Sequence, residues 1–267
     1  EWPETLVPVP FAGHLWFLQY LFLISLATLP LLLYLRTSNG RRMIARIADT
    51  CDCSGGIFLF AVPLAVALAG FRGLFEAQRS WADLAWYGTY FVIGYILAAD
   101  HRLTRSVVRH SWVCCGLWVF GFVGGIGFLV LAVDYDPVPG RQSFSVIYLL
   151  YQAVWSVTSW SAVVFVLSLG AKYLNRDHSA LTSATEAVLP FYLLHQTVIL
   201  AVGFFVVRFS LTLLSKLMLV IAISFPITVA LCELLVRPFN AARCLFGMKA
   251  TTRPRAVLGA LSGRAAP

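Results

Sequence analysis

The chain has 267 residues, of which 60% are hydrophobic and only 12% are charged. Soluble globular domains average roughly 45–50% apolar and about 25% charged residues, so this composition excludes an ordinary soluble domain and indicates a protein embedded in lipid. The formal net charge of +8 comes from basic residues that lie between apolar runs. Because no basic face rich in exposed aromatic residues accompanies them, we expect control of membrane topology and no nucleic-acid partner.

Seven apolar segments follow in chain order, each close to the roughly 20 residues that a helix needs to cross a bilayer. They cover residues 15–35, 57–71, 81–99, 111–133, a stretch within 142–171, 187–207 and 213–236. The second is short and needs flanking residues to reach across. The sequence therefore predicts an all-α fold, a polytopic integral membrane helical bundle of about seven transmembrane helices. We expect residues 1–248 to form this transmembrane domain and residues 249–267 to form a basic, disordered cytoplasmic tail.

The basic residues between the segments predict the orientation of the chain. Alternate gaps, together with the residues after the last segment (237–267), carry 15 of the 20 Lys and Arg residues, and the opposite gaps carry the other five. Because Lys and Arg are retained on the cytoplasmic side, we expect Glu1 outside the membrane and Pro267 in the cytoplasm. The first methionine is Met43, and an odd helix count with an external start favours three further helices upstream.

Few residues suggest chemistry, because the sequence contains no Walker-type glycine loop, no HExxH and no GxSxG. Cys51-Asp52-Cys53 has no second Cys or His pair at zinc-ligand spacing, so we expect no metal site and no disulfide framework. We interpret the charges near segment ends as surface charges that are capped or that snorkel to the membrane interface. These are Asp100, His101, Arg102, Glu186 and Glu233.

Two histidines are candidate catalytic residues. His195 lies near the centre of segment 187–207, shortly after Pro190, and ionisable groups at this depth are costly and are functional hypotheses by default. The alternative is that His195 only hydrogen-bonds a neighbouring helix. His14 stands at the outer edge of the first segment, where an interfacial imidazole needs no special explanation. Because the two differ in predicted depth, we expect them not to touch.

Three segments resemble the acyltransferase-3 family, in the order in which that family has them. They are GHLWFL at 13–18, GYILAAD at 94–100 followed by Arg-rich sequence, and FYLLHQT at 191–197. The resemblance covers essentially the whole chain and is closest to the glucan-modifying branch, whose namesake is glucan biosynthesis protein C. It implies about ten transmembrane helices in a full-length protein. It also implies an arginine and a histidine ten residues apart near the first helix, a spacing not found here.

The resemblance leads us to expect the C-terminal part of an O-acyltransferase of the bacterial inner membrane. Such an enzyme moves an acetyl or succinyl group from cytoplasmic acyl-CoA, a co-substrate, to a hydroxyl of a periplasmic or cell-envelope glycan. His195 would act as general base, and His14 would support it or face the acceptor. The residues that bind acyl-CoA stay unassigned, no bound cofactor is expected, and this chain alone is expected to be inactive.

Two other classes of protein remain open. A glycan or lipid transporter or flippase would perform no acyl transfer, and such proteins often show two similar halves with broken helices. No such halves occur in this sequence, and only Pro190 and Pro226 hint at broken helices. A structural or sensory seven-helix protein would have an interior without a site.

Overall fold

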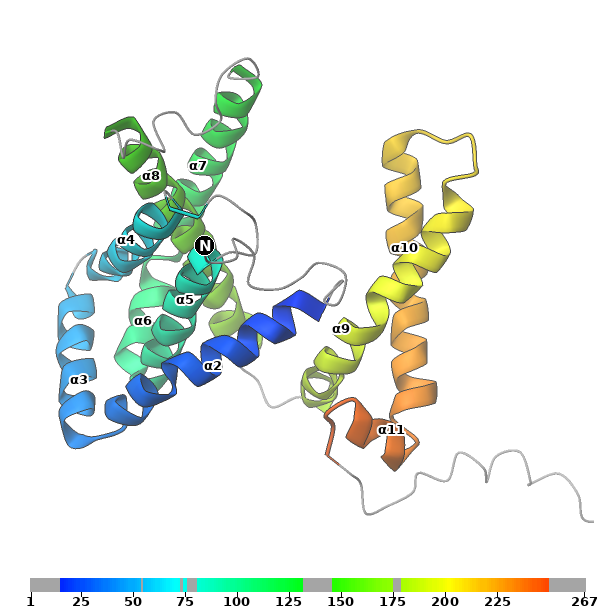
Figure 1. Cartoon of the computed structure of the whole chain (residues 1–267), viewed down its shortest axis with the longest axis horizontal. Coiled ribbons are helices and arrows are strands. Elements are labelled where there is room, and N and C mark those ends of the chain that lie inside the picture. Colours follow the sequence, from blue (N-terminus) through cyan, green and yellow to red (C-terminus); the bar gives the residue numbers. More distant parts are fainter. Residues whose placement is uncertain are drawn as a thin grey trace, which may run out of the picture. The chain divides into compact units, whose positions relative to one another are not determined.

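A computed structural model describes residues 15–53, 55–72, 74–75, 81–131, 146–174 and 179–249 (Figure 1). Every element in these ranges is helical, with no strand among them, which confirms the predicted all-α fold. The chain divides into two compact units, Glu1–Arg176 and Asp177–Pro267. The basic tail predicted for residues 249–267 lies outside the described residues except for its first position.

The first unit follows the predicted segments closely. Its elements are α2 (Trp16–Leu35), α3 (Ser38–Asp52), η2 (Gly56–Phe60), α4 (Ala61–Arg72), α5 (Trp81–Ala99), α6 (His101–Arg109), α7 (Ser111–Leu131), α8 (Val146–Leu169) and the π-helical turn η3 (Gly170–Leu174). Five predicted segments correspond to α2, η2 with α4, α5, α7 and α8. α3 and α6 occupy the basic stretches between them, where the sequence predicts only connections.

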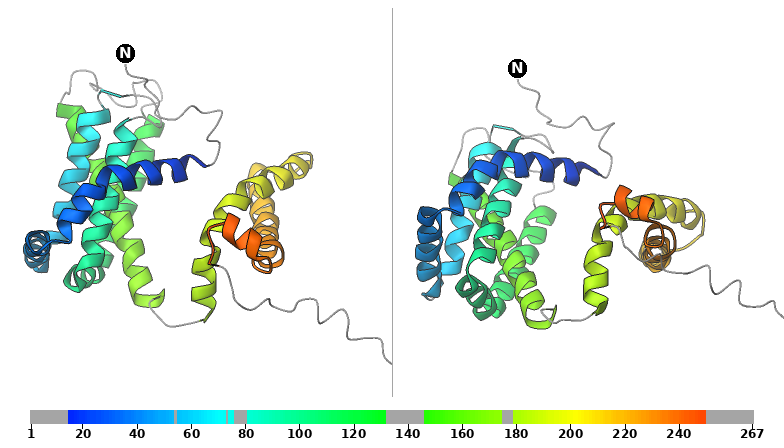
Figure 2. Two further views of the ribbon diagram at one scale, coloured as in Figure 1. Left: turned by 60° about the horizontal axis from the view of Figure 1, so that its bottom comes forward. Right: turned by 90° about the horizontal axis from the view of Figure 1, so that it is seen from below.

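Helix α4 lies between α5 and α8, α7 pairs with α8, and α2 crosses the upright helices obliquely (Figures 1 and 2). Hydrogen bonds from buried polar side chains hold these helices together, because lipid offers such side chains no alternative partner. The indole Nε1–H of Trp160 on α8 donates to the Ile57 carbonyl at 2.9 Å. The Tyr148 hydroxyl on the same helix donates to the Ala69 carbonyl at 2.8 Å. Both bonds join α8 to the η2–α4 stretch.

Of the five glycines in α7, only Gly121 is required for close helix packing, and a Cβ at Gly116 would meet nothing within 4 Å. A Cβ at Gly121 would overlap the Thr158 side chain of α8, whereas a Cβ at Gly124, Gly125 or Gly127 would meet nothing within 4 Å. Small residues allow membrane helices to approach closely. Within the glycine-rich stretch, it is therefore Gly121 that allows α7 to approach α8 closely.

Four helical stretches in the described residues are long and apolar enough to cross a membrane. They are Trp16–Leu35, Val146–Leu174, Ser183–Val206 and Leu213–Val236. A fifth results if His101–Arg109 and Ser111–Gly127, which meet at 59°, count as one bent span. Gly56–Arg72 is apolar but shorter than these stretches. α5 is helical but is not one of the candidate membrane-crossing helices. These helices confirm a multi-pass membrane protein, while seven crossings and their orientation stay predictions.

The second unit is a helical hairpin followed by a short helix. It contains α9 (Ser179–Val206), α10 (Leu213–Leu231), the π-helical turn η4 (Cys232–Val236) and α11 (Asn240–Leu245). α9 and α10 pack against each other, at the predicted segments 187–207 and 213–236 (Figure 1). Pro190 removes one backbone hydrogen bond, yet α9 continues through it without a break.

Candidate functional site

His195 lies on α9 among aromatic rings. Its imidazole stacks on Phe191, with ring centroids 6.1 Å apart and planes 4° from parallel. The Tyr192 ring lies 5.5 Å away, centroid to centroid. Residues three and four positions apart share one side of a helix, which is why the sequence Phe191-Tyr192-Leu193-Leu194-His195 brings these rings together. The side chain of His195 is half-buried.

A backbone contact determines which nitrogen of His195 carries the proton. Nδ1 lies 2.6 Å from the Tyr192 carbonyl oxygen. Because a carbonyl only accepts hydrogen bonds, Nδ1 must be the donor, and the neutral imidazole then has its lone pair on Nε2. This tautomer is the one that a general base needs when Nε2 is the reacting atom.

The α10 side of this hairpin supplies a buried hydroxyl group. Phe225 packs on Phe191, with ring centroids 5.7 Å apart, so the neighbouring Ser224 lies at the same level of the α9–α10 pair. Ser224 is 4% exposed, and its Oγ has no hydrogen-bond partner among the described residues. One turn on, the buried Thr228 hydroxyl donates to the Ser224 carbonyl at 2.8 Å. The hairpin thus has a histidine and polar groups along a largely apolar contact.

His14, the other candidate, lies outside the described residues. Its predicted separation from His195 therefore stays a prediction. Within the described ranges, no group of three or more His, Cys, Asp or Glu side chains could hold a metal ion.

Two arginines that the sequence analysis missed join the ends of the hairpin. Arg237 forms an ion pair with Glu233 at 2.6 Å and donates to the Ser183 carbonyl of α9. Arg243 is only 6% exposed. Its Nη2 lies 3.8 Å from a Glu186 carboxylate oxygen, and its Nε donates to the Lys249 carbonyl at 2.8 Å. The two glutamates are exposed, as predicted, but each faces a largely buried arginine.

A second polar region lies on α3 and α6, which pack side by side. α3 buries Gly40, Ile44, Ala48 and Cys51 on one face, and α6 buries Leu103, Ser106 and Val107. The Ser106 hydroxyl donates to the Cys51 carbonyl at 2.8 Å, and Arg109 donates to the Cys51 and Asp52 carbonyls. The carbonyl ends of α3 are thereby satisfied by α6.

Arg102 organises the charges at the start of α6. It forms ion pairs with Asp49 of α3 and with Asp100, the residue that caps α6. Asp100 accepts the Arg102 backbone N–H at 2.9 Å. The hydrogen bonds from the Arg102 side chain and backbone lower the pKa of Asp100 to about 2. Asp100 is therefore a helix cap, one of the two roles that the sequence suggested, and its side chain is largely shielded from solvent.

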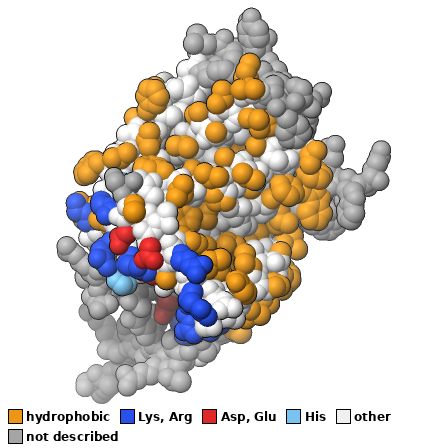
Figure 3. Space-filling model, turned by 90° about the vertical axis from the view of Figure 1, so that its left-hand side faces the viewer, with side chains coloured by type: hydrophobic (Ala, Val, Ile, Leu, Met, Phe, Trp, Pro, Cys, Tyr) orange, Lys and Arg blue, Asp and Glu red, His pale blue; other side chains and the backbone are white. Residues whose placement is uncertain are grey.

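The outward faces of these helices carry exposed cations. Lys and Arg side chains gather at one end of the face in Figure 3, beside a broad apolar surface. Arg41, Arg46 and Arg105 are exposed, and none of them forms an ion pair with a carboxylate in the described part of the chain. Guanidinium groups bind phosphate through paired hydrogen bonds. We call Arg41, Arg46 and Arg105 the basic layer.

Helices α5 and α8 meet through aromatic and hydroxyl side chains. The Tyr90 hydroxyl donates to Ser159 Oγ at 2.9 Å, and its ring lies 6.3 Å from Trp160. Trp86 packs on Tyr90 at 5.4 Å. The Trp86 indole N–H and the Ser156 hydroxyl are buried without a hydrogen-bond partner among the described residues. Such unsatisfied donors are uncommon in native proteins and suggest a polar ligand. Helical periodicity in one segment could not reveal this pairing of two distant segments.

Comparison with known proteins identifies the family of this chain. A family model described as an acyltransferase domain, of the acyltransferase-3 type, matches residues 2–237. No curated protein and no solved structure matches the chain.

Proposed function

This chain belongs to the acyltransferase-3 family, and from that premise we propose that it acts in transferring an acetyl or succinyl group from cytoplasmic acyl-CoA to a glycan hydroxyl of the cell envelope. The family and the membrane-spanning helices make it a membrane acyltransferase. The observation that carries the assignment is the extent of the family match, which includes the described membrane-spanning helices. The glucan-modifying branch and the bacterial inner membrane are parts of this proposal.

The basic layer of α3 and α6 supports acyl-CoA as the donor. Coenzyme A carries a diphosphate and a 3′-phosphate, and exposed guanidinium groups recognise such anions. The same positive charge favours a cytoplasmic location for this surface, on the side where acyl-CoA is found. We propose Arg41, Arg46 and Arg105 as contacts to these phosphates.

His195 supports the chemical step. In the proposed reaction, Nε2 removes the proton of the acceptor hydroxyl while the oxygen attacks the thioester carbonyl. The carbon–sulfur bond then breaks, an oxygen ester forms, and the coenzyme A thiolate leaves with the proton returned by the imidazolium. The hydrogen bond from Nδ1 to the Tyr192 carbonyl favours the tautomer that this step needs. General-base catalysis of this kind contributes about a hundred- to ten-thousand-fold in rate.

The aromatic contact between α5 and α8 supports a carbohydrate acceptor. Sugar rings present C–H groups that pack on aromatic faces, and their hydroxyls pair with groups such as the Trp86 N–H and the Ser156 hydroxyl. Both of these lack a partner among the described residues. Hydrogen bonds from a sugar that reaches these two groups would satisfy them.

Transfer of a labelled acyl group tests the proposal. Membranes carrying the protein, expressed from its whole gene, would receive radiolabelled acetyl-CoA or succinyl-CoA together with envelope glucan. We expect label in the glucan and release of free coenzyme A, both absent from membranes without the protein. Movement of glycan across the membrane with no consumption of either acyl-CoA would refute acyl transfer and favour a transporter.

A further inference from the structure

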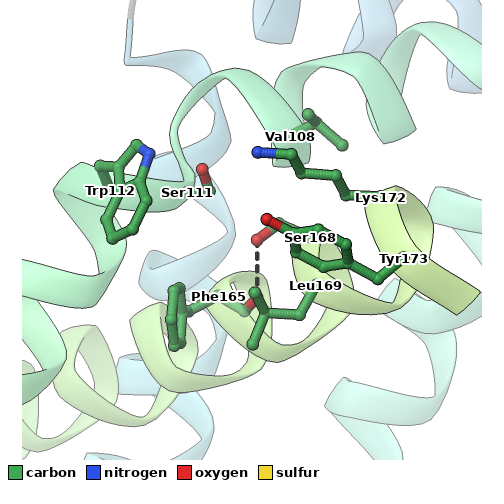
Figure 4. Close-up of a pocket in the computed structure, with 8 residues that line it drawn as sticks. All are labelled: Val108, Ser111, Trp112, Phe165, Ser168, Leu169, Lys172 and Tyr173. Carbon is green, nitrogen blue, oxygen red and sulfur yellow. Dashed lines mark hydrogen bonds between the residues drawn. The ribbon is translucent and has the colours of Figure 1, made fainter.

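A small pocket opens where α6, α7 and the end of α8 meet (Figure 4). Its volume is about 50 Å³. A single water molecule needs roughly 10–15 Å³ on this scale, so the pocket takes a few waters or one compact anion. It has no room for an adenine ring or a pantetheine arm.

The polar groups of the pocket suit an anion. Lys172 extends across it towards Ser111 in Figure 4, and its ammonium lies 5.2 Å from the centre of the Tyr173 ring. Lys172 has no carboxylate partner in the described part of the chain. The Ser111 hydroxyl likewise forms no hydrogen bond with any described residue, so it can donate to a ligand. The pocket thus presents one cation and one hydroxyl donor that have no such partner among the described residues.

Its neighbours place the pocket at the boundary between lipid and water. Lys172 stands in η3, at the end of the apolar stretch Val146–Leu174, and Ser111 follows the 59° bend between α6 and α7. Trp112 is 76% exposed, and Tyr173 is also exposed. Aromatic rings with a polar edge favour the headgroup level of a bilayer. A phosphate bound here would lie at that depth.

Exposed apolar residues accompany the pocket. The lining residue Leu169 is exposed, and so are Val113 and Val166, which follow the lining residues Trp112 and Phe165 in sequence. Hydrocarbon chains can pack on such side chains.

Lys172 lines the pocket, and the exposed Arg105 lies one helical turn before the lining residue Val108 on α6. A choline headgroup would bring a further cation among these, whereas an anionic lipid would not. We propose that this pocket binds the phosphate group of an anionic phospholipid from the surrounding leaflet.

Lipid binding by charge variants tests this site. The full chain would be titrated with short-chain phosphatidylglycerol or phosphatidylcholine in detergent, and the bound lipid counted by native mass spectrometry. We expect Lys172→Gln to weaken phosphatidylglycerol binding by about tenfold or more, because a charge-assisted hydrogen bond is lost. Ser111→Ala should weaken it by a smaller factor, and Lys172→Arg should retain it. Arg42→Gln removes a cation of α3 that does not line the pocket and should leave the affinity unchanged.

Three results would overturn the assignment. The first is equal phosphatidylglycerol affinity in the wild type and in Lys172→Gln, with the same melting temperature. The second is equal affinity for phosphatidylglycerol and phosphatidylcholine in the wild type. The third is displacement of the lipid by coenzyme A, with coenzyme A binding lost in Lys172→Gln, which would give the pocket to the acyl donor. If Lys172→Gln fails to fold, the phosphatidylglycerol affinities of Ser111→Ala and Lys172→Arg decide in its place. Weaker binding by Ser111→Ala than by Lys172→Arg supports the site, and equal binding by the two overturns it.

Discussion

Arg102 of α6 forms an ion pair with Asp49 of α3, and thereby ties together two helices from basic stretches 53 residues apart in sequence. The same guanidinium also pairs with Asp100 at the start of its own helix. The stretches α3 and α6, which connect membrane segments in the sequence, thus pack against each other at the surface. The pairing orients the helices that carry the basic layer.

The Asp100 cap should make the stability of the packed α3 and α6 helices sensitive to acid. Its pKa in the folded protein is about 2, below the ordinary value near 3.9. The ionised Asp100 carboxylate therefore stabilises the folded protein above about pH 4, and this stabilisation is lost as the pH falls towards about 2. We expect the melting temperature of the detergent-solubilised protein to fall across this window, and to fall less in Asp100→Asn. Equal slopes in the two proteins would contradict the assignment.

Gly121 should be intolerant of a larger side chain. Gly121→Val would collide with Thr158, and overpacking of this kind costs about 1–3 kcal/mol. Gly124→Val, three residues away in open space, is the matched control and should melt close to the wild type. Thr158→Ala should recover part of the loss in Gly121→Val. Similar melting temperatures for the two valine variants would show that α7 does not pack on α8 through this face.

His110 should be a structural histidine. Its Nε2 accepts the Gly55 N–H at 3.2 Å, and its Nδ1 lies 2.9 Å from the Ser106 carbonyl. Gly55 has a φ of 84°, which favours glycine. His110→Ala leaves the Gly55 donor unsatisfied, at a cost of about 1–3 kcal/mol. His101→Ala, whose side chain is 82% exposed, should leave the unfolding transition unchanged, and an equal effect of both would argue against this role.

Cysteine labelling should report the orientation of the chain. Cys53 is exposed, whereas Cys51 is buried, and burial raises the pKa of the Cys51 thiol. The thiolate is the reactive form. With Glu1 outside, a membrane-impermeant maleimide should label Cys53 only after the cells are permeabilised, and should leave Cys51 unlabelled in the folded protein. Labelling of Cys53 in intact cells would reverse the predicted orientation.

His195→Ala should lower acyl transfer by about a hundred- to ten-thousand-fold, the usual contribution of a general base. The variant should still insert into the membrane at wild-type abundance. Thr197→Ala, an exposed position on the same helix, is the control and should keep its activity. His14→Ala should have a weaker effect. Wild-type transfer by His195→Ala at equal abundance would leave His195 with a purely structural role.

The sequence was sufficient for the helices that cross lipid. A backbone in hydrocarbon must satisfy its own hydrogen bonds, so a long apolar run such as 213–236 has few alternatives to a helix. α3 and α6 were missed because their many charges resemble a connection. The signal was nevertheless present in the four-residue spacing of Gly40, Ile44 and Ala48, which marks one buried helix face.

The sequence by itself determined that the chain is a multi-pass helical membrane protein and pointed to its family, because hydropathy and local motifs are properties of single segments. Only the tertiary structure decided which polar residues meet. Gly121 and Gly124 are equivalent in sequence, and the rotation of α7 against α8 distinguishes them. The meeting of Lys172 with Ser111 at one pocket likewise depends on the bend before α7 and the π-helical end of α8. Such contacts depend on the packing of one helix against another, which the pattern of a single segment does not contain.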